Sequence, residues 1–175
     1  MRAALVGHRK PATTIYFSPN SRFLVAGDSD GSVRIWTIRD GSSKKLIDDA
    51  KNVLSVTFSP DGRHIASVDV HGWLRIWDAR SGRLLDSWEG HRQDALCVAF
   101  SPDGKGLVSG SGDLILKYWD VSSLAFMKRG RGRVMGGTPG QRFHQIRTFE
   151  GHTVRKISEF FSLSRSFDLS YILRN

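Results

Sequence analysis

Residues 90–120 read GHRQDALCVAFSPDGKGLVSGSGDLILKYWD, and this stretch decides the fold. Three of its runs are short and rich in Val, Ile, Leu and Trp, as strands are: Ala95–Phe100, Leu107–Ser111 and Leu114–Asp120. The first two runs are separated by Ser-Pro-Asp-Gly, in which proline and glycine suit a tight turn. Because the connections are so short, the stretch predicts antiparallel neighbouring strands.

The same pattern recurs along the chain with a period close to 42 residues. Phe-Ser-Pro occurs at 17–19, 58–60 and 100–102. An apolar residue followed by Trp occurs at 35–36, 76–77 and 118–119. Gly-His occurs at 7–8, 90–91 and 151–152. Ile146–Glu150 is the expected fourth strand of the third unit. Four-stranded units repeating every ~40–45 residues are typical of β-propeller blades.

The predicted fold class is therefore all-β, a partial propeller of about three four-stranded antiparallel blades plus a degenerate fourth. A seven-bladed ring would need roughly 294 residues at this period, so we expect a fragment of such a ring, from a truncated gene or a degenerate paralogue. Ala3–Val6 resembles the outer strand of a preceding blade. The fourth unit keeps Phe161-Ser162 but has Leu163 in place of the turn proline. The expected segments are 1–121 (repeats), 122–144 (insert) and 145–175 (outer strand and remnant).

On these residues the sequence resembles the WD40-repeat family. The likeness is carried by Gly90-His91, Phe100–Gly104, Ser109–Asp113 and Tyr118–Asp120, with the same order in the two earlier units. It covers about residues 3–121 and 146–161. The resemblance implies a β-propeller that serves as a rigid interaction platform, normally without catalysis.

The resemblance also implies a structural tetrad in each blade, made of hydrogen-bonded His, Ser or Thr, Asp and Trp side chains. In the third unit its members are His91, Ser109, Asp113 and Trp119. The first unit has an alanine in place of the hydroxyl, giving His8, Ala26, Asp30 and Trp36. The second unit has its acid and imidazole exchanged, giving Asp49, Ser67, His71 and Trp77. That exchanged pair either keeps its contact or leaves His71 pointing to solvent.

Ser, His and Asp in one unit also invite comparison with a hydrolase, but the sequence favours a structural role. Ser109 falls inside a predicted strand, and the residues around it, Leu107-Val-Ser-Gly-Ser111, do not form a Gly-x-Ser-x-Gly elbow. The constellation recurs with the repeat, as structural positions do. A single cysteine, Cys97, excludes an intrachain disulfide and cysteine-built zinc sites. We therefore expect no enzyme activity, no cofactor and no metal.

The charge is divided unevenly along this chain of 175 residues, whose formal net charge is +9. Residues 1–121 hold 16 Lys and Arg against 14 Asp and Glu, whereas residues 122–175 hold 10 against 3. Within the insert, Lys128–Arg133 alternates basic residues with glycine, a composition that also binds single-stranded nucleic acid. A flexible surface loop is the simpler interpretation of 122–144, and nucleic-acid binding by the basic C-terminal third is the alternative function.

The predicted function is that of a non-catalytic protein–protein interaction scaffold. The insert position and the wording of Leu107–Asp113 resemble the fungal Tup-type, Groucho-like transcriptional corepressors, which implies a nuclear assembly. The expected contact surface bears the loops before each first strand and the turns between second and third strands. Its candidate partner-binding residues are Arg9, Lys10, Lys51, Asn52, Arg92, Gln93 and Asp94.

Two further expectations concern assembly and location. Open blade edges favour self-association, because unpaired strands pair readily with other chains. No apolar run approaches the ~18 residues of a membrane span, and Met1–Lys10 lacks a secretory signal. These observations predict an intracellular protein, in the nucleus or the cytoplasm, with the nucleus favoured.

Overall fold

The computed structural model describes residues 4–47, 51–126 and 144–150. Their strands form three antiparallel four-stranded sheets, each following chain order. The first sheet holds β1 (Ala12–Phe17), β2 (Phe23–Asp28), β3 (Val33–Thr37) and β4 (Ser43–Ile47); the second β5 (Val53–Phe58), β6 (His64–Asp69), β7 (Trp73–Asp78) and β8 (Leu84–Glu89); the third β9 (Ala95–Phe100), β10 (Gly106–Ser111), β11 (Ile115–Asp120) and β12 (His144–Glu150).

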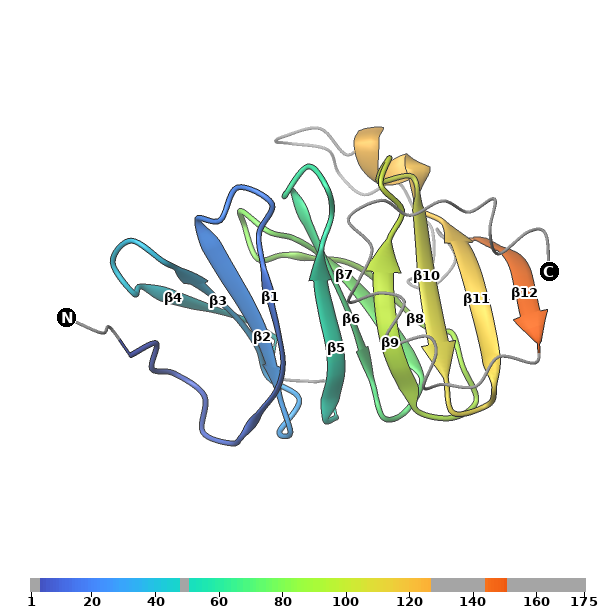
Figure 1. Cartoon of the computed structure of the whole chain (residues 1–175), viewed down its shortest axis with the longest axis horizontal. Coiled ribbons are helices and arrows are strands. Elements are labelled where there is room, and N and C mark those ends of the chain that lie inside the picture. The colour runs from blue at the N-terminus through green and yellow to red at the C-terminus, as the bar shows by residue number, and fades with distance from the viewer. Residues whose placement is uncertain (1–3, 48–50, 127–143, 151–175) are drawn as a thin grey trace.

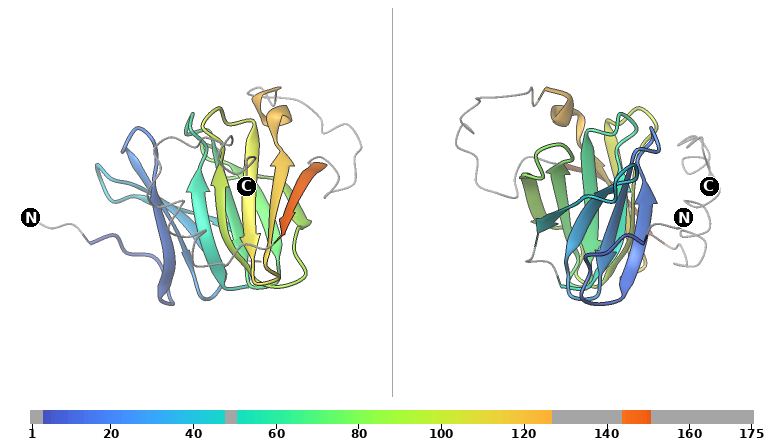
Figure 2. Two further views of the ribbon diagram at one scale, coloured as in Figure 1. Left: turned by 45° about the vertical axis from the view of Figure 1, so that its right-hand side comes forward. Right: turned by 90° about the vertical axis from the view of Figure 1, so that its left-hand side faces the viewer.

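The three sheets stand side by side as propeller blades. β5 lies against β1 and β2 of the first blade, and β9 lies against β5 and β6 of the second. The first strands β1, β5 and β9 therefore follow one another along one side of the molecule (Figure 1), and Figure 2 shows the same row of sheets from two further directions. The partial β-propeller predicted from the sequence is confirmed.

The serine of the Phe-Ser-Pro motif explains why each blade turns where it does. In the second blade the Ser59 hydroxyl donates to Asp61 Oδ1 (2.6 Å) and accepts the backbone N–H of His64 (2.9 Å). Ser101 donates to Asp103 Oδ1 in the same way (2.6 Å). Each hydroxyl is buried and bonded on both sides of the turn, so the motif fixes the hairpin between first and second strands.

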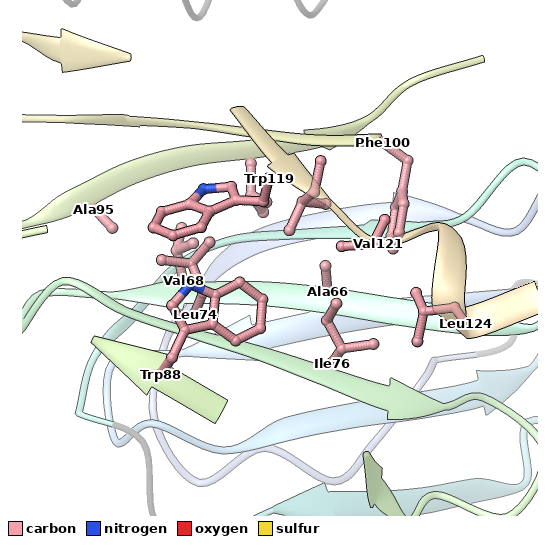
Figure 3. Packing of buried hydrophobic residues seen from close by; sticks show 12 residues of the cluster. Ala66, Val68, Leu74, Ile76, Trp88, Ala95, Phe100, Trp119, Val121 and Leu124 are labelled. Atoms are coloured by element: carbon pink, nitrogen blue, oxygen red, sulfur yellow. The ribbon is translucent and has the colours of Figure 1, made fainter. Parts of the chain in front are cut away.

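The core is divided between the two blade interfaces. One cluster of buried side chains lies between the first and second blades and includes Val25, Ile35, Phe58 and Trp77. The other lies between the second and third blades, where Phe100 and Trp119 pack over Ala66, Leu74 and Ile76 (Figure 3). Burying this apolar surface between sheets stabilises the stack.

Among the described residues, no blade covers the outer face of the first blade. Phe17 and Ile15 of β1 occupy the repeat positions of Phe58 and Val56, which are 3% exposed. Phe17 is 58% exposed and Ile15 62% exposed. The side chains that bury a blade against its predecessor therefore face outward on β1.

Several sequence expectations differ from the structure or lie outside its described part. Residues 4–8, which include most of Ala3–Val6, form no strand, and the Val6 carbonyl accepts the indole N–H of Trp36 instead of a strand partner's N–H. The predicted outer strand Ile146–Glu150 is present and begins two residues earlier, at His144. The degenerate fourth unit and residues 127–143 of the insert lie outside the described residues.

The start of the insert was predicted as a loop and is a short 3₁₀ helix, η1 (Ser122–Phe126). The backbone N–H of Leu124 donates to the carbonyl of Val121 (2.9 Å). The side chain of Leu124 is only 3% exposed and belongs to the core cluster between the second and third blades. One buried leucine thus ties this helical turn to the sheet.

Candidate interaction surface

A continuous hydrogen-bonded chain links four side chains of the third blade. His91 comes just before β9, Ser109 lies on β10, Asp113 in the turn after β10, and Trp119 on β11. Trp119 Nε1 donates to Ser109 Oγ (2.9 Å), and Ser109 Oγ lies 2.7 Å from His91 Nε2. His91 Nδ1 lies 3.2 Å from Asp113 Oδ2. The structure therefore brings together all four residues that the sequence proposed for this unit.

The protonation state of His91 follows from this arrangement. The carboxylate of Asp113 accepts hydrogen bonds, so Nδ1 of His91 carries the proton. Nε2 is then free to accept the hydroxyl hydrogen of Ser109, whose oxygen already accepts from Trp119. Burial lowers the pKa of His91 below its usual 6.5, more than the contact with Asp113 raises it. The neutral imidazole satisfies every member of this buried chain, which gives it a structural role.

In the first blade the acid partner of His8 is not the one predicted. His8 Nδ1 lies 2.6 Å from Asp28 Oδ2, whereas Asp30 is exposed. Asp28 ends β2 and is 1% exposed, so its carboxylate points inward while the turn residue Asp30 points out. Because Ala26 offers no hydroxyl, Trp36 Nε1 donates instead to the carbonyl of Val6 (3.2 Å).

The second blade uses a cation in place of an imidazole. Asp69 occupies the repeat position of Asp28, and its Oδ2 lies 2.6 Å from Arg75 Nη1. His71 is exposed, as in the alternative that leaves its ring in solvent, and Asp49 lies outside the described residues. Within the described part of the chain, the buried Ser67 Oγ and Trp77 Nε1 have no hydrogen-bond partner.

The loops at one end of the blades form a shared surface, held by backbone hydrogen bonds. We call the segments before β1, β5 and β9, together with the second-to-third-strand turns, the loop surface. The backbone N–H of Gly112 donates to the Asp94 carbonyl (3.0 Å), and the N–H groups of Gly90 and His91 both donate to Gly72 (2.9 and 3.1 Å). A Cβ on Gly72 would lie 2.1 Å from the His91 carbonyl oxygen, so this close approach requires glycine.

Comparison with known proteins decides the family. The family model described as WD domain, G-beta repeat matches residues 2–37, 42–78 and 82–120, more than half of the chain. The chain belongs to the WD40 family. WD40 repeats serve in general as protein–protein interaction scaffolds, and the family is generally non-catalytic.

A solved structure titled "Structure of U3-55K" is similar to this WD40 chain, with a TM-score of 0.70 and 25% sequence identity. The similarity covers 85% of this chain and 42% of that one, so this chain spans less than half the length of the structure it matches. No curated protein matches the chain. These matches establish the family and the fold. The kind of partner that the WD40 chain binds is inferred from its own surface.

Most of the candidate partner-binding residues lie open on the loop surface. Six of the seven are exposed: Arg9, Lys10, Lys51, Arg92, Gln93 and Asp94. Asn52 is half-buried, has a φ of 42° and accepts the backbone N–H of Val70 (3.3 Å). Because its contacts fix the loop before β5, Asn52 differs from the six exposed candidates.

Sequence reasoning missed two exposed apolar residues: Leu114, in a turn of the loop surface, and Trp73, the first residue of β7 directly after another of its turns. Leu114 is 56% exposed and Trp73 is 37% exposed. Leu114 also has a φ of 66°, at the position where the two earlier turns have Gly31 and Gly72 with φ of 87° and 76°. A left-handed backbone costs a branched residue roughly 1–2 kcal/mol, so leucine here is a strained choice. Aligning the three turns by repeat position would have revealed it.

Among the described residues, no group of three or more His, Cys, Asp or Glu is placed to hold a metal ion. No helix in this part of the chain is long and apolar enough to cross a membrane. Burial raises the pKa of the partly buried Cys97 to about 11, which keeps it a thiol at neutral pH.

Proposed function

We propose that this WD40 chain is a scaffold that binds other proteins through its loop surface, with Leu114 and Trp73 as apolar anchors. The loop surface also carries exposed charges: Arg92 and Asp94 follow His91, and Lys51 precedes β5. An apolar centre with a polar rim is the usual anatomy of a protein interface.

Leu114 is the observation that carries this proposal. An exposed leucine buries little apolar surface, and its left-handed backbone is a cost that glycine avoids in the other two blades. Strained, exposed residues gather where a surface is selected for contact and not for stability. A partner that buries Leu114 would offset the strain.

The test replaces Leu114 by the residue that the repeats themselves use. Leu114→Gly should raise the free energy of unfolding slightly, by up to about 1 kcal/mol, because it relieves the left-handed backbone. The same variant should lose at least about tenfold in affinity for partners captured by the wild-type chain, measured by biolayer interferometry. Ile38→Gly on the opposite loops, 40% exposed, is the matched control for loss of an exposed aliphatic side chain. Undiminished binding by Leu114→Gly would refute the anchor role.

We further propose that the assembly is a transcriptional corepressor or another nuclear complex. The support is the sequence likeness of Leu107–Asp113 and the position of the insert after β11. Nuclear localisation is preferred to cytoplasmic on the same ground. Imaging of the tagged chain, together with repression of a reporter to which it is tethered, tests both statements.

The alternative function is nucleic-acid binding by the basic C-terminal third, which the excess of 10 cations over 3 anions in residues 122–175 supports. Such binding should weaken steeply with salt and disappear when residues 127–143 are deleted. It should be indifferent to Leu114→Gly. The two functions therefore respond to different variants.

We also propose self-association through the uncovered face of the first blade. Phe17 and Ile15 are exposed at positions that are buried against the preceding blade elsewhere in the chain. A second copy that covers this face would remove the apolar side chains from water.

A further inference from the structure

A groove of about 500 Å³ opens between the first two blades, at the end away from the loop surface. Its wall from the first blade includes Phe23, Ile35 and Trp36, and its wall from the second includes Ala79 and Arg80. The floor is apolar, and Trp36 and Ile35 are 2% and 8% exposed. The groove is thus built into the blade interface.

The chain itself shows what fits a groove of this kind. The corresponding space between the second and third blades is filled by Val121 and Leu124, which are 0% and 3% exposed. Figure 3 shows Leu124, on its helical turn, directed toward Ile76, the counterpart of Ile35. A leucine on a short helical turn therefore has the shape that this interface accepts.

The first groove stays open because the second blade lacks these side chains. Ala79 stands at the position of Val121. Each donates its backbone N–H to the turn between the first and second strands of its own blade, at the carbonyls of Arg63 and Lys105 (2.8 and 2.9 Å). The position of Leu124 is taken by Gly82. With a φ of 73°, Gly82 has no side chain to place in the groove, and a Cβ there would lie 2.8 Å from the Lys44 side chain.

The rim of the groove is positive. Lys44 and Arg80 are exposed, and Lys44 Nζ donates to the carbonyl of Ser81 across the blade boundary. Among the described residues, no carboxylate forms an ion pair with either cation. Asp40 and Asp78 on the adjoining turns accept hydrogen bonds from Ser42 and Ser81 within their own turns (2.8 and 2.6 Å).

From the filled and open grooves together, we propose that the groove between the first and second blades binds an acidic peptide segment of a partner protein. The segment places a leucine on one helical turn against Ile35 and Trp36, and its carboxylates meet Lys44 and Arg80. This second binding surface adds to the proposed scaffold function and shares no residue with the loop surface.

The test uses the full chain and a fluorescein-labelled peptide, DVSSLAFEE, which copies residues 120–126 and adds two glutamates. Fluorescence anisotropy should show saturable binding. The peptides DVSSAAFEE and DVSSLAFKK should bind at least about tenfold more weakly, because they lack the leucine or the negative charge.

Variants of the chain locate the binding. Ala79→Leu, which fills the groove, and Lys44→Glu, which reverses its rim, should each weaken binding about tenfold. Ala79→Val, which installs the residue of the third blade, is the milder substitute if the leucine impairs folding. Arg92→Glu on the loop surface is the charge control and should change affinity less than about twofold.

Equal affinity for DVSSLAFEE and DVSSAAFEE, or no effect of filling the groove, would overturn the inference. Absence of saturable binding would do the same. The loop surface is tested separately, because Leu114→Gly should leave binding of this peptide unchanged. Failure of the groove and failure of the proposed scaffold function are therefore distinguishable.

Discussion

Ser109→Ala should destabilise the third blade far more than the same change at the equivalent position of the second blade. Ser109 is 0% exposed, accepts from Trp119 Nε1 (2.9 Å) and bonds His91 Nε2 (2.7 Å). Its loss leaves two buried polar groups unpaired, at roughly 1–3 kcal/mol each, so we expect about 2–6 kcal/mol in total. Ser67 is 1% exposed, and no partner of its hydroxyl is found in the described residues. Ser67→Ala should therefore stay within about 0.5 kcal/mol.

Urea unfolding followed by tryptophan fluorescence measures this difference. With a slope of about 2 kcal/mol per molar urea, the middle of the usual range, the midpoint of Ser109→Ala should fall by roughly 1–3 M, while that of Ser67→Ala hardly moves. Both substitutions remove the same atom from the same repeat position, so hydrogen bonding is what distinguishes them. Equal shifts of the two midpoints would refute the reasoning, since they would show that cavity effects outweigh the network.

Three further perturbations test the rest of the structure. Asp28→Ala should lower the free energy of unfolding by about 2–3 kcal/mol in a urea titration, because it removes the partner of His8 and of the turn's backbone N–H groups. Asp30→Ala should cost under about 0.5 kcal/mol, and the reverse order would favour Asp30 as the partner of His8. Burial holds the pKa of His91 below 6.5 in the folded chain, so the unfolded chain takes up the proton first as the pH falls. The free energy of unfolding should therefore decrease below pH 6.5. A His91→Gln variant whose stability depends on pH as strongly as the wild type's would contradict this. Phe17→Glu should make the sedimentation coefficient independent of concentration, provided that the first-blade face mediates association.

The strand pattern could be predicted from sequence because its signals are local and repeated. Ser-Pro-Asp-Gly turns and Trp positions recur at a fixed spacing, and the strand Ala95–Phe100 matches β9 at both ends. The helical turn η1 gave no such signal, since five residues are too few to show a helical period. Leu124 forms part of the core through a tertiary contact that no neighbouring residue specifies.

The polar networks were predictable only where the repeat pattern is complete. Counting offsets from the third unit assigned Asp30 to His8, but the volume beside that imidazole can be reached from two positions of the turn. Asp28 reaches the His8 imidazole from the end of β2. The same repeat position in the third blade is Ser111, whose side chain is shorter, and there His91 bonds to Asp113 in the turn. Side-chain length and the direction of each turn residue therefore decide which aspartate bonds to His8. Sequence spacing alone gives neither.

The buried network and the proposed contact surface are joined at a single turn. Asp113 Oδ2 meets His91, and its Oδ1 accepts the backbone N–H of Ile115 (3.0 Å), so the two residues on either side of Leu114 are held together. The N–H of Leu114 itself donates to the Ser111 carbonyl (3.2 Å). A leucine can keep a left-handed backbone only where its surroundings over-determine it. The turns of the other two blades are held in the same way, because Asp28 and Asp69 accept the backbone N–H groups on either side of Gly31 and Gly72 (2.8–3.1 Å). Space therefore distinguishes the three turns: a Cβ on Gly72 would lie 2.1 Å from the His91 carbonyl oxygen, whereas Leu114 is 56% exposed and has room for its side chain.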